Sequence, residues 1–341
     1  MEHLSILIVG VVAAGLAFDF INGFHDASNS IATVVATRVL TPRQAVFWAA
    51  FFNVAAAFFF STGVAKTVGS GLVSLDAVTP AVVLCGLIGA TLWGITTWRL
   101  GLPSSSSHAL LGGYAGSAMA NHALHHGWQT LSDPIIVAGW IKVVIFIVIA
   151  PVMGFSLSFV MMRGLDYLKT RSKFSPSDAA YKKLQLLSSA FLSLMHGSND
   201  AQKTAGIITS ALVAAGSLPS FDVIPTWVLG LSYGTMGLGT LFGGWRIVRT
   251  MGLRLTRLDS RGGVCAESAA ALSILSATLF NLPISTTHVV TGSILGVGAA
   301  NDPDKVHWSI GRRIAWAWVF TIPASALVSG CAMALVVAFS Q

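Results

Sequence analysis

Apolar residues in this chain fall into long runs that short polar segments interrupt. A helix that crosses a bilayer needs about 20 apolar residues. By this measure the pattern predicts ten membrane-spanning segments: 4–37, 44–66, 80–99, 104–120, 134–162, 184–217, 225–243, 264–280, 284–300 and 314–338. The first and sixth carry polar residues inside and are expected to be broken helices. Segments 104–120 and 284–300 are short and rich in Ser, Thr and Gly, which is also compatible with re-entrant hairpins.

Composition supports an all-α polytopic membrane protein. Of the 341 residues, 54% are hydrophobic and only 10% are charged, whereas a soluble domain carries about 25% charged residues. The mean hydropathy is +0.74. The first residues lack the basic stretch of a cleaved signal peptide. The net charge of +7 is explained better by basic cytoplasmic loops than by a nucleic-acid partner.

The distribution of Lys and Arg predicts the orientation. With the N-terminus outside, 17 of the 20 basic residues lie in inside loops, as the excess of positive charge in cytoplasmic loops requires. Both termini are therefore expected outside the cell (inner) membrane. A basic cytoplasmic linker, 163–183, separates the halves 1–162 and 184–341. Each half has five predicted spans. Because five is an odd number, the second half enters the membrane from the side opposite to the first, which makes it an inverted repeat.

A short polar motif occurs once in each half. It reads NGFHDASN around Asp26 and MHGSNDAQK around Asp200. Carboxylates inside a bilayer are costly and mark functional sites by default. Gly23 and Gly197 suggest that each long segment is interrupted where it lines a cavity. Asp26 with Asn29 can then coordinate a cation or carry a proton, while a structural helix-to-helix hydrogen bond remains the alternative.

A second element also occurs twice, with a constant offset. Residues 102–116 read LPSSSSHALLGGYAG and residues 282–296 read LPISTTHVVTGSILG. Proline favours the first turn of a helix, and free N–H groups at a helix start bind oxyanions. The hydroxyls can donate to the same anion. The motif therefore predicts an oxyanion site, although hydroxyls at these positions are also usual helix caps. The residues concerned are Ser105, Ser106, Ser107, Ser285, Thr286 and Thr287.

The two Asp motifs differ at one position, where Asn29 aligns with Lys203. An ammonium suits phosphate but repels sodium, so this difference favours proton coupling over sodium coupling. Lys203 can instead simply neutralise Asp200. His25 has a pKa range suited to proton handling. Glu267, at the start of the eighth predicted span, is a further candidate for coupling.

These motifs resemble the duplicated signature of the inorganic phosphate transporter (PiT) family, and the likeness extends over nearly the whole chain. VCAESAAA around Glu267 is also similar. The resemblance implies a homodimeric inverted-repeat carrier in the lipid bilayer that moves inorganic phosphate with sodium ions or protons and binds no tight cofactor. The HD and NDAQK forms resemble the bacterial proton-coupled branch, in which a divalent metal ion travels with phosphate in some members. The implied site comprises Asp26, Asn29, Asn199, Asp200, Lys203 and the hydroxyls above, with Glu267 as a weaker member.

The leading hypothesis is a proton-coupled phosphate symporter that works by alternating access and is not an enzyme. A sodium-coupled symporter or a sulfate permease of the same fold remains an alternative. A membrane-embedded phosphotransfer enzyme is the alternative from another class, but the chain has no P-loop, HExxH motif or acidic metal cluster. An anion channel would lack coupling, which the paired carboxylates do not favour.

Overall fold

Twelve α-helices make up the protein over residues 2–172 and 176–340, which a computed structural model describes. The first half contains α1 (Glu2–Ala36), α2 (Pro42–Ala55), α3 (Gly63–Ser70), α4 (Pro80–Arg99), α5 (Ser106–His126) and α6 (Val137–Ser172). The second contains α7 (Asp178–Ala214), α8 (Thr226–Phe242), α9 (Trp245–Arg249), α10 (Ser260–Leu279), α11 (Thr286–Asn301) and α12 (Trp308–Ser340). A π-helical segment, Thr250–Arg254, continues α9, and short 3-10 turns lie at Ala56–Phe58, Leu75–Ala77, Trp128–Thr130 and Pro303–Lys305.

Fewer helices meet the requirements of a membrane span than the ten predicted. Among the described residues, five are long and apolar enough, or six if the bent pair α2–α3 counts as one span. That pair turns by 85° between Phe58 and Gly63. The helices α5 and α11 begin at residues that are almost fully buried. By length and composition alone, five or six helices thus qualify as spans, and the count of ten stays a prediction.

The prediction that the first and sixth segments are broken was wrong, because α1 and α7 are each continuous. Their motif glycines allow close packing instead of a break. A Cβ added to Gly23 would lie 2.0 Å from the carbonyl oxygen of Met236, and one added to Gly197 would lie 2.3 Å from that of Asn53. Each glycine thus permits a neighbouring helix to approach backbone to backbone.

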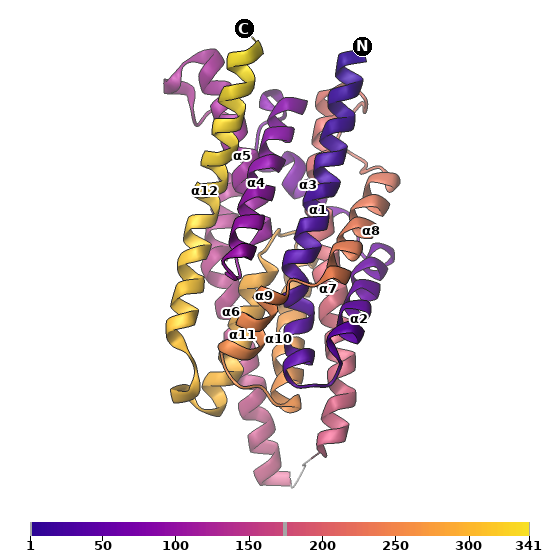
Figure 1. The fold of residues 1–341 in the computed structure, drawn as a ribbon, viewed down its shortest axis with the longest axis vertical. Helices are drawn as coiled ribbons and strands as arrows, with labels where there is room; N and C mark the ends of the chain where they lie inside the picture. The colour runs from indigo at the N-terminus through magenta and orange to yellow at the C-terminus, as the bar shows by residue number, and fades with distance from the viewer. Residues whose placement is uncertain (1, 173–175, 341) are drawn as a thin grey trace.

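Two helical hairpins enter the molecule from opposite ends (Figure 1). The helices α4 and α5 meet near mid-height and return to the end where the two termini lie. The helices α10 and α11 also meet near mid-height but come from the other end. Residues 104–107 and 285–287 at the two hairpin tips are buried. The indole N–H of Trp318 on α12 donates to the carbonyl of Pro103 at the first tip, at 3.0 Å.

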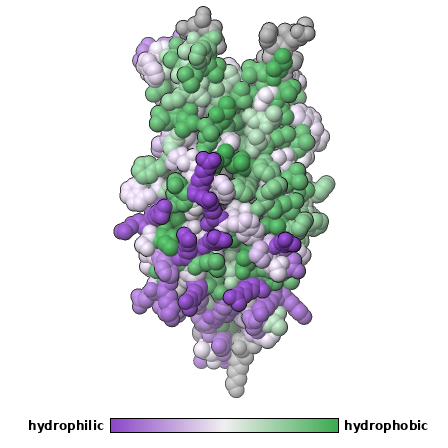
Figure 2. Space-filling view, in the orientation of Figure 1, coloured by the Kyte–Doolittle hydropathy of each residue, from purple (hydrophilic) through white to green (hydrophobic). Residues whose placement is uncertain are grey.

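Both termini lie at the same end, and α1 and α7 run in opposite directions (Figure 1). Hydrophilic residues gather in the lower half of the face drawn in Figure 2, away from the termini. The predicted linker 163–183 is mostly helical, because α6 extends to Ser172 and α7 begins at Asp178. Its residues 173–175 lie outside the described part of the chain. Large apolar side chains such as Val148, Leu327 and Phe339 are exposed on the long outer helices, as lipid contact requires.

Candidate functional site: two hairpin tips and two aspartate motifs

The two aspartate motifs and the two hairpin tips meet in one buried cluster. Asp26 comes from α1, Asp200 from α7, and the hydroxyls come from the starts of α5 and α11. One ligand atom from each of Asp26, His196 and Asp200 lies within 4.8 Å of the others. All of these side chains are buried, so the cluster is closed to solvent in this conformation.

Asp26 is contacted by both halves of the chain. His25 Nδ1 lies 2.7 Å from its Oδ1, and the Ser106 hydroxyl donates to its Oδ2 at 2.5 Å. From the second hairpin, the hydroxyl of Thr287 donates to Oδ1 at 3.5 Å. The carboxylate therefore has a titratable imidazole as its neighbour and hydroxyl donors from both tips.

Asp200 has a fixed positive partner instead. Lys203 Nζ donates to its Oδ1 at 2.6 Å, and His196 Nε2 lies 3.1 Å from its Oδ2. The Thr286 hydroxyl donates to the same Oδ2 at 3.0 Å. The ion pair is wholly buried, so neither charge is screened by water.

Lys203 connects the two hairpins. Besides its bond to Asp200, its ammonium donates to the Ser107 hydroxyl at 2.6 Å and to the Ile284 carbonyl at 2.7 Å. These three acceptors satisfy the three donors of an ammonium. Both roles considered from the sequence are thus compatible with its position: it neutralises Asp200, and it lies between the hydroxyl-bearing tips.

The amides of the motifs bind the second hairpin at two places. Asn29 donates to the hydroxyls of Thr286 and Thr287, at 3.3 and 2.9 Å. Asn199 Nδ2 donates away from the carboxylate cluster, to the Thr278 hydroxyl at 3.0 Å and to the Leu282 carbonyl at 3.2 Å. The amide of Asn199 therefore holds the connection between α10 and α11, next to the hairpin tip, in this structure.

The capping alternative is found at the first hydroxyl of each predicted trio. Ser105 accepts from the backbone N–H of His108 at 3.1 Å, and Ser285 accepts from that of His288 at 3.3 Å. Each serine is the N-cap of its helix. The caps orient the helix starts toward the carboxylates, and the N–H groups of the first two helical residues have no intrahelical partner there.

Glu267 lies in a separate polar cluster on α10. It accepts from Thr33 at 2.6 Å, from Gln185 at 2.9 Å and from Ser188 at 2.5 Å. These partners come from α1 and α7. Glu267 therefore joins three helices, and its hydrogen bonds do not include the two aspartates.

Sequence reasoning placed His196 in a motif but not among the site residues. It precedes Asp200 by one helical turn, so both side chains share a face of α7. That spacing was the available signal. His25 has a further role at its other nitrogen, which lies 3.2 Å from the Thr97 hydroxyl and 3.4 Å from the Ser104 hydroxyl.

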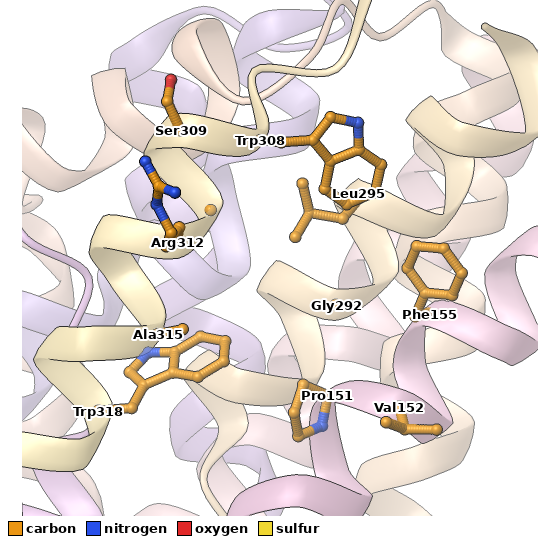
Figure 3. Close-up of a pocket in the computed structure, with 11 residues that line it drawn as sticks. Pro151, Val152, Phe155, Gly292, Leu295, Trp308, Ser309, Arg312, Ala315 and Trp318 are labelled. Atoms are coloured by element: carbon orange, nitrogen blue, oxygen red, sulfur yellow. The ribbon is translucent and has the colours of Figure 1, made fainter. Parts of the chain in front are cut away.

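A pocket of about 620 Å³ lies elsewhere, between α6, α11 and α12 (Figure 3). Trp308, Ser309 and Arg312 surround one end of it, and Pro151 and Trp318 lie toward the other. Most of its lining is apolar, unlike the hydroxyl-rich cluster. The carboxylates and the hydroxyl donors of the two motifs thus lie at the hairpin tips and not at this pocket.

Comparison with known proteins identifies the family. The model of the phosphate transporter family matches residues 22–180 and again residues 169–329. The chain belongs to the phosphate transporter family. Over 323 residues it is 46% identical to a probable low-affinity inorganic phosphate transporter of Rhizobium meliloti (strain 1021), covering 95% of this chain and 94% of that protein. It is 40% identical to one of Bacillus subtilis (strain 168), covering 97% and 98%.

The fold of this phosphate transporter family member is also found in a solved structure. A protein described as "The sodium-dependent phosphate transporter" superposes with a TM-score of 0.85, at 24% identity, over 97% of this chain and 99% of that one. The family membership and the apolar helices make the chain an integral membrane protein. The relatives are named as transporters or permeases and not as enzymes, which removes the phosphotransfer alternative.

Proposed function

We propose that this protein imports inorganic phosphate together with protons, by alternating access around the cluster at the hairpin tips. The observation that supports this most is the convergence of Asp26 and Asp200 with the starts of α5 and α11 at one buried place. A helix start and hydroxyl donors bind an oxyanion. The neighbouring carboxylates of Asp26 and Asp200 are negatively charged, and a coupling cation that binds to one of them would neutralise that charge.

Phosphate would be held by the hydroxyls at the two tips and by Lys203. The hydroxyls of Ser106, Ser107, Thr286 and Thr287 now donate to carboxylates or accept from other protein groups. Phosphate oxygens can accept from the same hydroxyls. Binding of phosphate therefore replaces hydrogen bonds between the hydroxyls and the side chains of α1 and α7 by hydrogen bonds to the anion. It needs no further charged residue.

The proposed coupling ion is the proton, and Asp26 with His25 is the pair we assign to it. Lys203 already supplies the positive charge beside Asp200 at 2.6 Å, whereas Asp26 has only a titratable neighbour at 2.7 Å. Sodium coupling is the second candidate, because the solved protein of the same fold is described as sodium-dependent.

A divalent metal ion fits the proposal as cargo that travels with phosphate. Asp26, His196 and Asp200 offer two carboxylate oxygens and one imidazole nitrogen within 4.8 Å. Such a set suits several divalent ions. The ion would neutralise the phosphate that the hydroxyls hold.

The repeated element order and the opposite directions of α1 and α7 support an inverted repeat (Figure 1). In such carriers one part moves against the other around a midplane site. We place both termini outside the inner membrane, because the predicted inside loops hold 17 of the 20 basic residues. We further propose a homodimer, as the family resemblance implies.

The test is uptake of radiolabelled phosphate into proteoliposomes of the purified protein. A pH gradient and a sodium gradient are imposed separately, and sulfate and a divalent metal ion are added in turn. We expect uptake driven by the pH gradient, weak competition by sulfate and stimulation by the metal. Uptake that responds only to the sodium gradient would mean that sodium, and not the proton, is the coupling ion. Absence of phosphate uptake under every gradient would overturn the proposal.

A further inference from the structure

Asp19 on α1 is a buried carboxylate that the central cluster does not use. It is 0% exposed. Neither of its oxygens has a hydrogen-bond partner among the described residues. It precedes Asp26 by seven residues, which is two helical turns or about 10 Å along the axis. On α1, which runs downward in Figure 1, this places Asp19 on the side of the cluster nearer the termini.

Three closely packed helices surround Asp19. The Thr204 hydroxyl on α7 and the Ser232 hydroxyl on α8 face its carboxylate. Both side chains are 0% exposed, and neither hydroxyl has a hydrogen-bond partner in the described parts of the chain. Glycines bring the helices together: a Cβ on Gly15 would lie 2.7 Å from the Ile208 side chain of α7. Asp19, Thr204 and Ser232 thus form a buried polar cluster between three packed helices.

The negative charge of Asp19 is not neutralised by its charged neighbour. That neighbour is Asp200, which is also negative. Lys203 pairs with Asp200 at 2.6 Å. The helix α8 contains no Asp, Glu, Lys, Arg or His, and on α1 the nearest such groups are His25 and Asp26. An unpaired buried carboxylate is strongly disfavoured, so its counter-charge must come from solution.

The chemistry of these groups also suits a cation. Hard cations are bound by carboxylate and carbonyl oxygens. Asn22, one turn along the same face of α1, adds a buried and unpartnered amide oxygen.

We propose that Asp19, Thr204 and Ser232 form a second binding site for the coupling cation, separate from the phosphate site and on the side of it nearer the termini. The ligand is a small monovalent cation, either a sodium ion or a proton with its bound water. The cation would load here before phosphate is carried. The proposal rests on the proposed symport, since it names where the coupling ion binds.

The experiment compares the wild-type protein with Asp19→Asn in two measurements. The first is the melting temperature in detergent as sodium replaces choline at constant pH, and as pH changes in choline. The second is phosphate uptake into proteoliposomes under each gradient, alongside phosphate exchange without a gradient. We expect Asp19→Asn to lose gradient-driven accumulation at least tenfold and to keep exchange. Asp222→Asn, the same change at an exposed position, is the matched control.

The outcomes separate the possible cations. If the variant loses only the sodium response of the melting temperature, the site binds sodium, and if it loses only the pH response, the site binds a proton. Thr204→Val and Ser232→Ala should weaken the same response by about two- to tenfold. If the Asp19→Asn variant keeps the sodium response and the pH response of the melting temperature and accumulates phosphate fully, the proposed cation site is refuted. Absence of phosphate transport by the wild-type protein would instead refute the proposed function.

Discussion

Lys203→Asn is the substitution that tests the coupling argument most directly. It gives the second aspartate motif the residue that the first motif has at Asn29. It removes the ammonium that donates to Asp200, Ser107 and the Ile284 carbonyl. The carboxylate of Asp200 then remains buried without its fixed positive partner.

The expected magnitude follows from that geometry. Removing one partner of a buried ion pair costs about 3–5 kcal/mol of stability. A cation that binds in the vacated place restores part of this, about 2.7 kcal/mol when its concentration is 100 times its dissociation constant. The Lys203→Asn protein should therefore be strongly destabilised in choline and should recover more than half of the lost stability in saturating sodium.

The assay measures the melting temperature of purified protein in choline and in sodium, together with phosphate uptake driven by a sodium gradient. Lys142→Asn removes a lysine from an exposed position on α6 and is the matched control. We expect the wild-type protein and the control to respond weakly to sodium. If Lys203→Asn shows the same weak response in both measurements, the ammonium does not determine ion selectivity and the reasoning is refuted.

Three further predictions concern the tips, the packing and the orientation. Ser106→Ala should raise the phosphate concentration for half-maximal uptake by about two- to tenfold, since one hydrogen bond contributes about 0.5–1.5 kcal/mol. Gly23→Ala should destabilise the protein by at least about 1–3 kcal/mol, because its Cβ would meet a backbone carbonyl at 2.0 Å; a thermal melt measures the loss. A membrane-impermeant maleimide should label Ser132→Cys in intact cells and should label Thr170→Cys only after permeabilisation.

Each of these predictions has a control on the same molecule. Ser276→Ala removes a hydroxyl that bonds only its own helix, at the Ser273 carbonyl, and should leave phosphate affinity unchanged. Gly10→Ala adds a Cβ with nothing within 4 Å, so it should leave stability equal or higher. Equal melting temperatures for Gly23→Ala and Gly10→Ala would contradict the packing argument. The reverse labelling pattern of the two cysteines would invert the proposed topology.

The sequence predicted the residues that meet better than it predicted the shape of the helices that carry them. Repetition was the reason: Asp26 with Asp200, and Ser106 with Thr286, were singled out because each element occurs twice, and the structure brings all four into one cluster. Gly23 was misinterpreted because a glycine inside an apolar run can either interrupt the helix or allow a neighbouring helix to pack closely. Only the position of the neighbouring helix distinguishes these two uses.

The path of α11 through the protein could not be predicted from hydropathy alone for a similar reason. The helix α11 is apolar enough to resemble a crossing, but it starts at the buried Thr286. A polar helix start is tolerated inside a membrane protein where other segments cover it. The role of Ser105 was equally undecided, since a hydroxyl before a helix can cap it or face a ligand, and its cap is visible only in the contact to His108.

The two halves contribute unequal chemistry to the centre, and this inequality bears on coupling. His25 contacts both Asp26 and the tip of α4–α5, whereas Lys203 contacts Asp200 and both tips. Motion of one tip away from the other must break either the bond between Lys203 and Ser107 or the bond between Lys203 and the Ile284 carbonyl. A ligand shifts such an equilibrium only by binding one arrangement more tightly. Phosphate that accepts from Lys203 and Ser107 together would favour the closed arrangement, while a proton on the Asp26 side would remove the negative charge that opposes its entry.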